Sequence, residues 1–533
     1  MFDPHSRPTA EEAPSRKGLV LLALCAAALI INVDVTIVNV ALPSLVRELG
    51  ATTTNLQWVV DAYTLVFAAL ILAAGSFSDR VGRKGILLGG LAVFAAGSLA
   101  GSLSTSAGQL IASRALMGIG AAGIFPSTLS LIANVFTERG ERAKAIGLWG
   151  ATTGIGVATG PIVGGWLLEH YWWGSVFLFM VPLAALVGAA VAAFVPTSKD
   201  PAAPPIDWYG LVLSSISMGT IVFGIIQAPD WGWGDSSTIA MFAIGLALLA
   251  VFVVVEARTP RPMLDVRLFR NPRFSAASGS ITIGFFSLAG FTFLVTQYFQ
   301  FVKGYSPFAT GLRLLPVALS IAVAAVAGTK LAVRIGNKTV VAVGLAAWGV
   351  AMWWISTVSG ATTYPELVGQ MILGGGGLGL ITAPATEAIL GAVPPEKAGV
   401  GSAVNDATRL FGAALGVAII GSVAASLYAN RLGATIPAHL PAQAASAAKG
   451  SLGGALVAAG TLQHAGLTSA AHDLSAAAIA AFLHALEGGL RVAGTIALAG
   501  SVMAAALLPS RPISPVEAED TATDVEPVLA LEG

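Results

Sequence analysis

The stretch LVLLALCAAALIINVDVTIVNVAL (residues 19–42) is the first long apolar segment of the chain, and it indicates the fold class. A helix that crosses a bilayer needs about 20 mostly apolar residues, so this segment is long enough to be one. Its one charged side chain, Asp34, costs roughly 2.5–3.5 kcal/mol at the centre of a membrane helix. Such a residue is commonly functional or paired. The residues that surround Asp34 are therefore a guide to the function of the chain.

The composition of the whole chain is that of a membrane protein. Of its 533 residues 55% are hydrophobic and 11% are charged, and the mean hydropathy is +0.80. Soluble chains carry about 25% charged residues. The formal net charge is zero, so charge gives no reason to expect nucleic-acid binding. With Cys25 as its one cysteine, the chain has no intrachain disulfide and no cysteine metal cluster.

The start of the chain could be mistaken for a signal peptide, because Arg16 and Lys17 precede an apolar run. The run reaches Leu42, which is too long for the apolar part of a signal peptide, and no clear cleavage site precedes it. We interpret the run as a retained first span.

Apolar segments of the length that a bilayer requires recur fourteen times along the chain. The expected spans are residues 19–42, 55–76, 86–103, 109–132, 145–168, 175–195, 208–227, 237–256, 274–298, 311–329, 339–357, 365–389, 399–426 and 487–508.

The distribution of Lys and Arg over the connecting segments orients these spans. Twenty of the 28 Lys and Arg residues lie in segments on the side of the N-terminus, and four lie within or at the edge of spans. The remaining four, on the other side, are Arg47, Lys303, Arg431 and Lys449. Cytoplasmic segments of membrane proteins carry such an excess. Both termini are therefore predicted to be cytoplasmic, and a change of one in the number of spans would remove the bias.

Two short sequences indicate an internal repeat. DRVGRK (residues 79–84) and VRIGNK (residues 333–338) both keep the pattern R-x-G-x-K, and each joins two spans on the predicted cytoplasmic side. Repeated halves are typical of secondary transporters, which bind substrate between the halves near mid-membrane. The second copy lacks the aspartate, so Asp79 is predicted to have a role that is needed once.

We accordingly predict an all-α polytopic membrane protein made of two six-helix halves with two inserted helices. Its expected parts are a cytoplasmic tail (1–18), a first six-helix bundle (19–195), a linker with the two inserted spans (196–273), a second six-helix bundle (274–508) and a disordered cytoplasmic tail (509–533).

A long external loop, residues 428–486, lies before the last span. It is rich in Ala, Gly and Ser and contains His464, His472 and His484. A metal site is one interpretation, but the spacing of the three His residues fits no common ligand pattern. A loosely helical exposed loop is the interpretation that we prefer.

Five motifs, in order, resemble those of the major facilitator superfamily and of its fourteen-span drug:proton antiporters. They are DVTIVNVALP (34–43) in span 1, GSFSDRVGRK (75–84) between spans 2 and 3, RALMGIGAA (114–122) in span 4, GATTGIGVATGPIVGG (150–165) in span 5 and GSAVNDATR (401–409) in span 13. Ser175 and Leu410 stand where many relatives carry Trp and Glu, which leaves the substrate open.

The resemblance implies the major facilitator fold and several site residues. It implies a conformational lock at Gly75, Asp79, Arg80, Gly82, Arg83 and Lys84, with Asp79 near the start of span 13, where a helix N-terminus favours a carboxylate. It implies a tightly packed, bendable span 5 suited to export, with the antiporter motif Gly150, Gly154, Gly160, Pro161, Gly164 and Gly165.

Three charged residues of the first half share one depth. At 1.5 Å per residue, Asp34, Asp61 and Arg114 lie roughly 8–12 Å below the outer ends of their spans. Two carboxylates near one arginine can form a site for a proton or a cation, and exchange of one for the other is antiport. The alternative is a permanent structural pair of Asp34 with Arg114.

A second charged group lies near the inner face of the other half. Asp406 and Arg409 are three residues apart on span 13 and so share a face, and Glu387 in span 12 is close to the same depth. Asp406 is predicted to take part in proton coupling or cation binding. An inner gate made by Glu387 and Arg409 is the equally weighted alternative for the group. Candidate residues for the substrate cavity are Trp58, Tyr63, Phe125, Phe291, Gln297, Tyr298 and Asn405.

The leading function is proton-coupled export of amphipathic or cationic drugs, and the alternative is export of a native metabolite or lipid with incidental drug transport. Uptake by symport is disfavoured by the span 5 resemblance. No nucleophile–base or metal constellation supports an enzyme, and no G-x-x-x-x-G-K-[ST] loop supports an ATP-driven pump. We expect a monomer in the cytoplasmic membrane, with no cofactor and no nucleic-acid partner, that handles protons and a small-molecule substrate in the lipid bilayer.

Overall fold

A computed structural model describes residues 12–200, 206–260, 262–392, 398–436 and 440–508. Its regular elements are helices, and fourteen of the helical segments are long and apolar enough to cross a membrane. The fourteen spans and the all-α class predicted from the sequence are thereby confirmed, and the chain is a multi-pass membrane protein.

The first half of the molecule consists of α1 to α7, in which α6 and α7 together form the sixth span. The bounds are Glu12–Leu49 (α1), Thr53–Val81 (α2), Arg83–Ser102 (α3), Ala107–Val135 (α4), Arg139–His170 (α5), Ser175–Leu178 (α6) and Met180–Phe194 (α7).

Two inserted helices follow, α8 (Trp208–Trp231) and α9 (Ser236–Arg258). Side chains that accept hydrogen bonds from the first turn begin both: Asp207 accepts from the backbone N–H of Gly210, and Asp235 from that of Ser237. The bond from Ser237 lowers the pKa of Asp235, because it favours the carboxylate.

The second half consists of α10 to α15 together with α18. The bounds are Pro272–Gln297 (α10, preceded by η1, Val266–Arg270, and continued by the π-helix η2, Tyr298–Val302), Pro307–Arg313 (α11), Leu315–Ile335 (α12), Asn337–Ile355 (α13), Tyr364–Leu390 (α14), Ala398–Thr435 (α15) and Thr468–Leu507 (α18).

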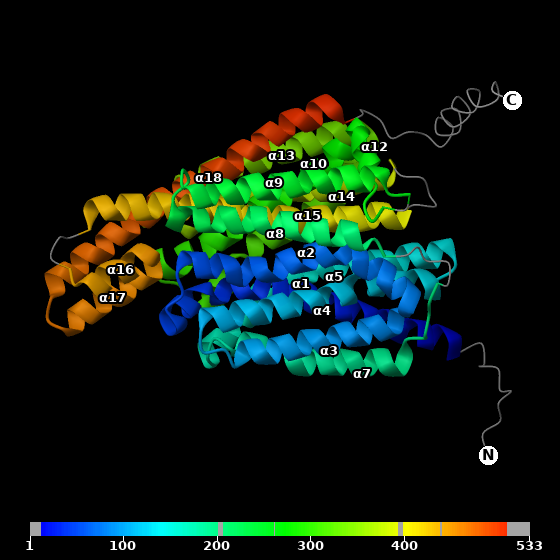
Figure 1. The fold of residues 1–533 in the computed structure, drawn as a ribbon, viewed down its shortest axis with the longest axis horizontal. Coiled ribbons are helices and arrows are strands. Elements are labelled where there is room, and N and C mark those ends of the chain that lie inside the picture. Colours follow the sequence, from blue (N-terminus) through cyan, green and yellow to red (C-terminus); the bar gives the residue numbers. More distant parts are fainter. Residues whose placement is uncertain (1–11, 201–205, 261, 393–397, 437–439, 509–533) are drawn as a thin grey trace, which may run out of the picture.

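The helices run side by side along the long axis of the molecule (Figure 1). α1 begins and α18 ends at one end, which we call the terminal end. The opposite end carries α16 (Ala442–Gly450) and α17 (Leu452–His464), and we call it the hairpin end. The bias of Lys and Arg predicts that the terminal end is cytoplasmic.

The two halves repeat one pattern of helix packing. In the first half α1 packs on α5, α4 packs on α2 and α3, and α3 packs on α7. In the second half the equivalent spans do the same: α10 packs on α15, α14 on α12 and α13, and α13 on α18. An internal repeat of six spans produces such a pattern.

The shared R-x-G-x-K pattern has a local conformational reason. Gly82 ends α2 and begins α3 with a φ of 139°, and Gly336 ends α12 and begins α13 with a φ of 86°. A positive φ of this kind strains residues with a Cβ, so both turns need glycine. The repeated motif therefore marks equivalent tight turns at the terminal end.

The segment 428–486 differs from the loosely helical exposed loop that we predicted. α15 continues to Thr435, α16 and α17 form a hairpin, and α18 begins at Thr468, well before the predicted start of the last span. Leu452 and Ala455 of α17 are buried, and the Thr53 hydroxyl donates to the carbonyl of Gly450 at 3.1 Å. The hairpin is thus a packed part of the fold that contacts the first half.

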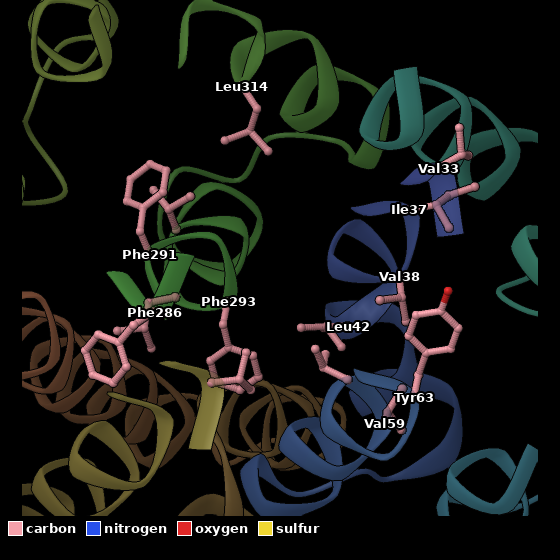
Figure 2. Packing of buried hydrophobic residues seen from close by; sticks show 14 of the residues in the cluster. Val33, Ile37, Val38, Leu42, Val59, Tyr63, Phe286, Phe291, Phe293 and Leu314 are labelled. Atoms are coloured by element: carbon pink, nitrogen blue, oxygen red, sulfur yellow. The ribbon is translucent and has the colours of Figure 1, made fainter. Parts of the chain in front are cut away.

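Apolar side chains hold each half together. Figure 2 shows buried residues of α1 and α2, such as Val38 and Tyr63, on one side and Phe286, Phe291 and Phe293 of α10 on the other. In a bilayer, close packing of such side chains replaces the hydrophobic effect as the main source of helix association.

Candidate functional site

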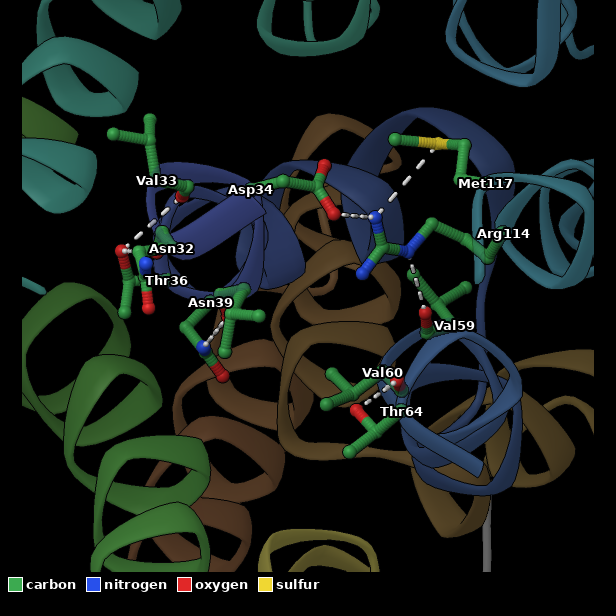
Figure 3. A network of polar contacts seen from close by, with 11 residues as sticks. Asn32, Val33, Asp34, Thr36, Asn39, Val59, Val60, Thr64, Arg114 and Met117 are labelled. Carbon is green, nitrogen blue, oxygen red and sulfur yellow. Dashed lines mark hydrogen bonds and ion pairs between the residues drawn. The ribbon is translucent and has the colours of Figure 1, made fainter. Parts of the chain in front are cut away.

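A buried ion pair joins α1 to α4. Arg114 Nη1 lies 2.7 Å from Asp34 Oδ2, and neither side chain has more than a trace of exposed surface (Figure 3). The sequence-based expectation that these two residues meet is therefore confirmed. The second carboxylate oxygen of Asp34, Oδ1, has no hydrogen-bond partner within the described ranges.

The remaining contacts of Arg114 come from α2 and from its own helix. Its Nε donates to the carbonyl of Val59 at 3.0 Å, and its guanidinium lies 4.3 Å from the centre of the Tyr63 ring. Its Nη1 also faces the sulfur of Met117. The cation is held by a carboxylate, a carbonyl and an aromatic face, which together compensate for its burial.

Asp61 is not part of this group, contrary to the clustering that we expected from its depth. Trp58 and Leu65, three residues before and four after Asp61, pack against buried residues of α8 and α15. Val59 and Tyr63 face Arg114 from the other side of α2. Asp61 is fully buried, and neither of its carboxylate oxygens has a hydrogen-bond partner in the described part of the chain.

A cavity lies between the two halves. Its lining includes residues of α1, α2, α4 and α5 from the first half, and of α10, α12 and α15 from the second. The lining is mostly apolar, and its polar and charged residues are Asn32, Thr36, Asn39, Thr64, Thr292, Asp406 and Arg409. Thr36 and Asn39 lie on a different side of α1 from Asp34 (Figure 3), so the ion pair stands behind the cavity wall.

The residues that we predicted for the cavity are largely wrong. Phe125 and Phe291 do line it, whereas the described lining does not include Trp58, Tyr63, Gln297, Tyr298 or Asn405. Trp58 packs on Phe223 of α8, and the Tyr298 hydroxyl donates to the carbonyl of Ser359. The sequence position of an aromatic residue gives its depth along the helix. It does not tell how the helix is rotated, and so does not tell whether the side chain points into the cavity.

Asp406 and Arg409 of α15 both line the cavity, as their shared face predicted. Arg409 Nη2 donates to the hydroxyl of Thr386 at 3.3 Å, and its guanidinium lies 5.3 Å from the centre of the Phe285 ring. Its Nε is buried, and the described part of the chain supplies no acceptor for it. Among the described ion pairs, none joins Arg409 to Asp406 or to Glu387.

Glu387 lines a second pocket, between α14 and α15, and Arg409 belongs to the lining of both pockets. The second pocket reaches Leu390 and Gly391, where α14 ends. Arg409 therefore stands between the central cavity and a pocket that reaches the terminal end. Glu387 and Arg409 form no ion pair with each other in the described structure.

Two buried glutamines join the halves on the hairpin side of the cavity. Gln57 Nε2 of α2 lies 3.2 Å from the carbonyl of Val417, 3.0 Å from that of Ala418 and 3.1 Å from the Ser422 hydroxyl, all in α15. Gln300 Nε2 donates to the carbonyl of Val40 in α1 at 2.9 Å. These hydrogen bonds hold the two halves together at the hairpin end.

The glycines of span 5 (α5) differ in how closely they pack against neighbouring helices. A Cβ on Gly160 or Gly164 would collide with Thr36 or Ile37 of α1, and one on Gly165 would come within 2.6 Å of Phe308 Cα in α11. Gly150 and Gly154 face open space. The close approach that the motif predicted therefore exists at Gly160, Gly164 and Gly165, and Pro161 lines the cavity.

The loop between α2 and α3 is tied to its own half. Arg83 Nε lies 2.6 Å from Asp79 Oδ1, and Arg83 Nη1 donates to the Ser198 hydroxyl at 2.8 Å. Lys84 Nζ donates to the carbonyl of Ala192, while Arg80 is exposed and Gly75 lies near Pro126. Residues 393–397, before α15, lie outside the described residues, so the expected approach of Asp79 to that helix stays a prediction.

The sequence analysis did not predict the polar residues of α1 that line the cavity. Asn32, Thr36 and Asn39 follow one another at intervals of four and three residues, which places them on one face of the helix. Polar side chains at helical spacing inside an apolar span were the available signal. Gln57 and Gln300 were missed as well, and a lone glutamine in a span carries no comparable pattern.

Comparison with known proteins agrees with this architecture. The family model of the Major Facilitator Superfamily matches residues 24–417. A solved bacterial homologue of the human lysosomal transporter Spinster, in an inward-facing and occupied conformation, has the same fold, with a TM-score of 0.67 at 15% identity over 96% of this chain and 100% of that chain.

Several curated relatives are similar over most of the chain. The multidrug efflux pump LfrA of Mycolicibacterium smegmatis is 35% identical over 85% of this chain and 90% of its own length. The methyl viologen resistance protein SmvA of Salmonella typhimurium is 33% identical over 84% of this chain and 90% of its own. The chain therefore belongs to the major facilitator superfamily, and it is related there to the fourteen-span multidrug and antibiotic efflux pumps.

Proposed function

We propose that the protein exports amphipathic or cationic drugs across the cytoplasmic membrane in exchange for protons, by alternating access. The observation that carries the proposal is the cavity between the halves, whose mostly apolar lining includes one carboxylate, Asp406. Concave apolar sites with few polar groups are typical of small-molecule binding. A carboxylate in such surroundings attracts a lipophilic cation.

The two carboxylates that we assign to proton binding, Asp34 and Asp61, are separate from the lining of the cavity. Asp34 and Asp61 are buried outside the cavity lining, yet each lies on a helix that also contributes to it. A buried carboxylate without hydrogen bonds is costly, and protonation removes its charge. Gain or loss of a proton at Asp61 therefore changes the packing of α2 against α8 and α15, where the halves meet.

The contacts between the halves support alternating access. The halves are hydrogen-bonded at the hairpin end through Gln57 and Gln300, and the second pocket, which shares Arg409 with the cavity, reaches the terminal end. If the terminal end is cytoplasmic, this conformation receives substrate from the cytoplasm. Rocking of one half against the other would open the opposite end. Two relatives, the multidrug efflux pump LfrA and the methyl viologen resistance protein SmvA, favour cationic drugs as the substrate class.

The test is proton release from the purified protein in weakly buffered detergent after addition of ethidium, a lipophilic cation. Asp34→Asn and Asp61→Asn are compared with the wild type, and ethidium binding is followed by its fluorescence. We expect release from the wild type and its loss in at least one of the two variants. Asp230→Asn is the matched control, because Asp230 is an exposed carboxylate at the hairpin end of α8.

Normal proton release from both variants would refute the assignment of Asp34 and Asp61. Ethidium binding without proton release in the wild type would refute antiport, and Asp34 would then be a structural partner of Arg114. Transport of ethidium into reconstituted vesicles, compared with and without a proton gradient, measures whether transport itself is coupled to protons.

A further inference from the structure

We infer that the central cavity binds amphoteric substrates, in which a cationic group meets Asp406 and an anionic group meets Arg409. The inference rests on the proposed function and specifies the class of substrate. A drug that is only cationic would use one of the two charged residues in the lining, whereas a zwitterion would use both.

The placement of the two charges is the first support. Asp406 and Arg409 lie three residues apart on α15, on one face, and both line the same cavity. They are not joined by an ion pair in the described structure, since Arg409 is bonded instead to Thr386. The two charges still attract each other, and the Asn405 side chain bonds to Asp406, so a ligand with a group for each charge competes with these contacts.

The unused hydrogen-bond donors of Arg409 are the second support. A guanidinium has five N–H donors, and within the described residues the Arg409 side chain donates a single hydrogen bond, to the Thr386 hydroxyl. Its Nε is buried and has no acceptor among the residues that the structure describes. A buried donor without an acceptor costs free energy, and a carboxylate or phosphate on the substrate can accept two bonds from the planar guanidinium.

The position of Arg409 gives the bound substrate a direction. Arg409 lines both the central cavity and the pocket that leads to the terminal end, whereas Asp406 lines the central cavity without belonging to the second pocket. The anionic group of the substrate would thus face the terminal end, and the cationic group would lie deeper. Phe285, against which the guanidinium packs, keeps Arg409 at this junction.

Two dyes that differ in one group provide the test. Tetramethylrhodamine free acid is a zwitterion, and its methyl ester keeps the cation but lacks the carboxylate. Their binding to the purified full-length protein is measured by fluorescence anisotropy. Arg409→Gln is expected to weaken binding of the free acid by about tenfold or more, the usual worth of a hydrogen bond to a charged group, and to leave the ester unchanged.

Two further variants separate the roles of charge and geometry. Arg409→Lys keeps the charge but loses the planar pair of donors, so its loss for the free acid should be smaller than that of Arg409→Gln. Asp406→Asn should weaken both dyes, because both carry the cation. Unchanged binding of the ester also shows that Arg409→Gln is folded.

If Arg409→Gln weakens the binding of both dyes equally, the inference is overturned, since Arg409 would then act on the shape of the cavity and not on the carboxylate. Binding of the ester alone by the wild type would overturn it as well. Proton release with ethidium is the independent measurement of the proposed function. If ethidium releases protons but the free acid does not bind, the inference alone fails, and if ethidium releases none, the proposed function fails.

Discussion

Arg114 Nη1 and Asp34 Oδ2 lie 2.7 Å apart in the interior of the first half, with the face of Tyr63 against the guanidinium. The pair links α1 to α4 behind the cavity wall. One oxygen of Asp34 has no hydrogen bond to any described residue, so the hydrogen-bonding capacity of the carboxylate is only partly used. A neutral Asp34 can still accept a hydrogen bond from Arg114, but the attraction between opposite charges is lost.

Removal of Arg114 should be more damaging than removal of both partners. Arg114→Gln leaves the Asp34 charge buried and unpaired, which in proteins costs about 3–5 kcal/mol. The double variant Asp34→Asn with Arg114→Gln removes both charges and should recover most of the loss. Thermal unfolding in detergent measures the effect. An Arg114→Gln variant that melts like the wild type would contradict the importance of the pair.

Asp61 should tolerate neutralisation without loss of the fold. Asp61 has no partner, so Asp61→Asn breaks no hydrogen bond of the described structure. We expect a melting temperature close to that of the wild type together with loss of ethidium-driven proton release. Asp34→Asn, which loses an ion pair, should lower the melting temperature. The opposite order of the two melting temperatures would show that Asp61 is charged and paired in the protein.

Gln57 should hold the hairpin end closed. Gln57→Leu removes its hydrogen bonds to three groups of α15, each worth about 0.5–1.5 kcal/mol. We expect a larger share of molecules with longer distances between spin labels at Glu48 and Asn430, exposed positions of α1 and α15, in a Cys25→Ser background.

The matched control for Gln57 is Gln109→Leu. Gln109 is an exposed glutamine at the hairpin end of α4, and its side chain bonds within its own half, to Thr105. The two variants should therefore differ in the distance distribution. If they share one distribution, Gln57 does not control closure.

Gly165 should reject a methyl group that Gly154 accepts. A Cβ at Gly165 would lie 2.5 Å from the Pro307 carbonyl oxygen, between the two halves, whereas none of the surrounding atoms lies within 4 Å of one at Gly154. Overpacking of this kind costs about 1–3 kcal/mol. We expect Gly165→Ala to lower the melting temperature and the rate of ethidium export, and Gly154→Ala to change neither. Equal effects would show that helix propensity outweighs packing in span 5.

The membrane spans were predictable because each needs a run of apolar side chains, and no soluble structure requires fourteen such runs. The two turns at Gly82 and Gly336 were equally readable, since a positive φ requires glycine at the same place in both halves. The meeting of Asp34 with Arg114 followed from depth and from the cost of burying a lone charge.

The faces of the helices were not readable in the same way. Lipid and protein interior are both apolar, so the hydrophobic pattern of a span does not tell which side meets a neighbour. For that reason Asp61 was expected beside Arg114 but faces α8 and α15, and Trp58 and Tyr298 were expected in a cavity that they do not line. The packed hairpin α16–α17 was also hidden, because both helices are too short to cross a bilayer and gain their burial from contact with α18 and α1. Depth in the membrane is a property of one helix, whereas the direction of a side chain depends on how the helices rotate against one another.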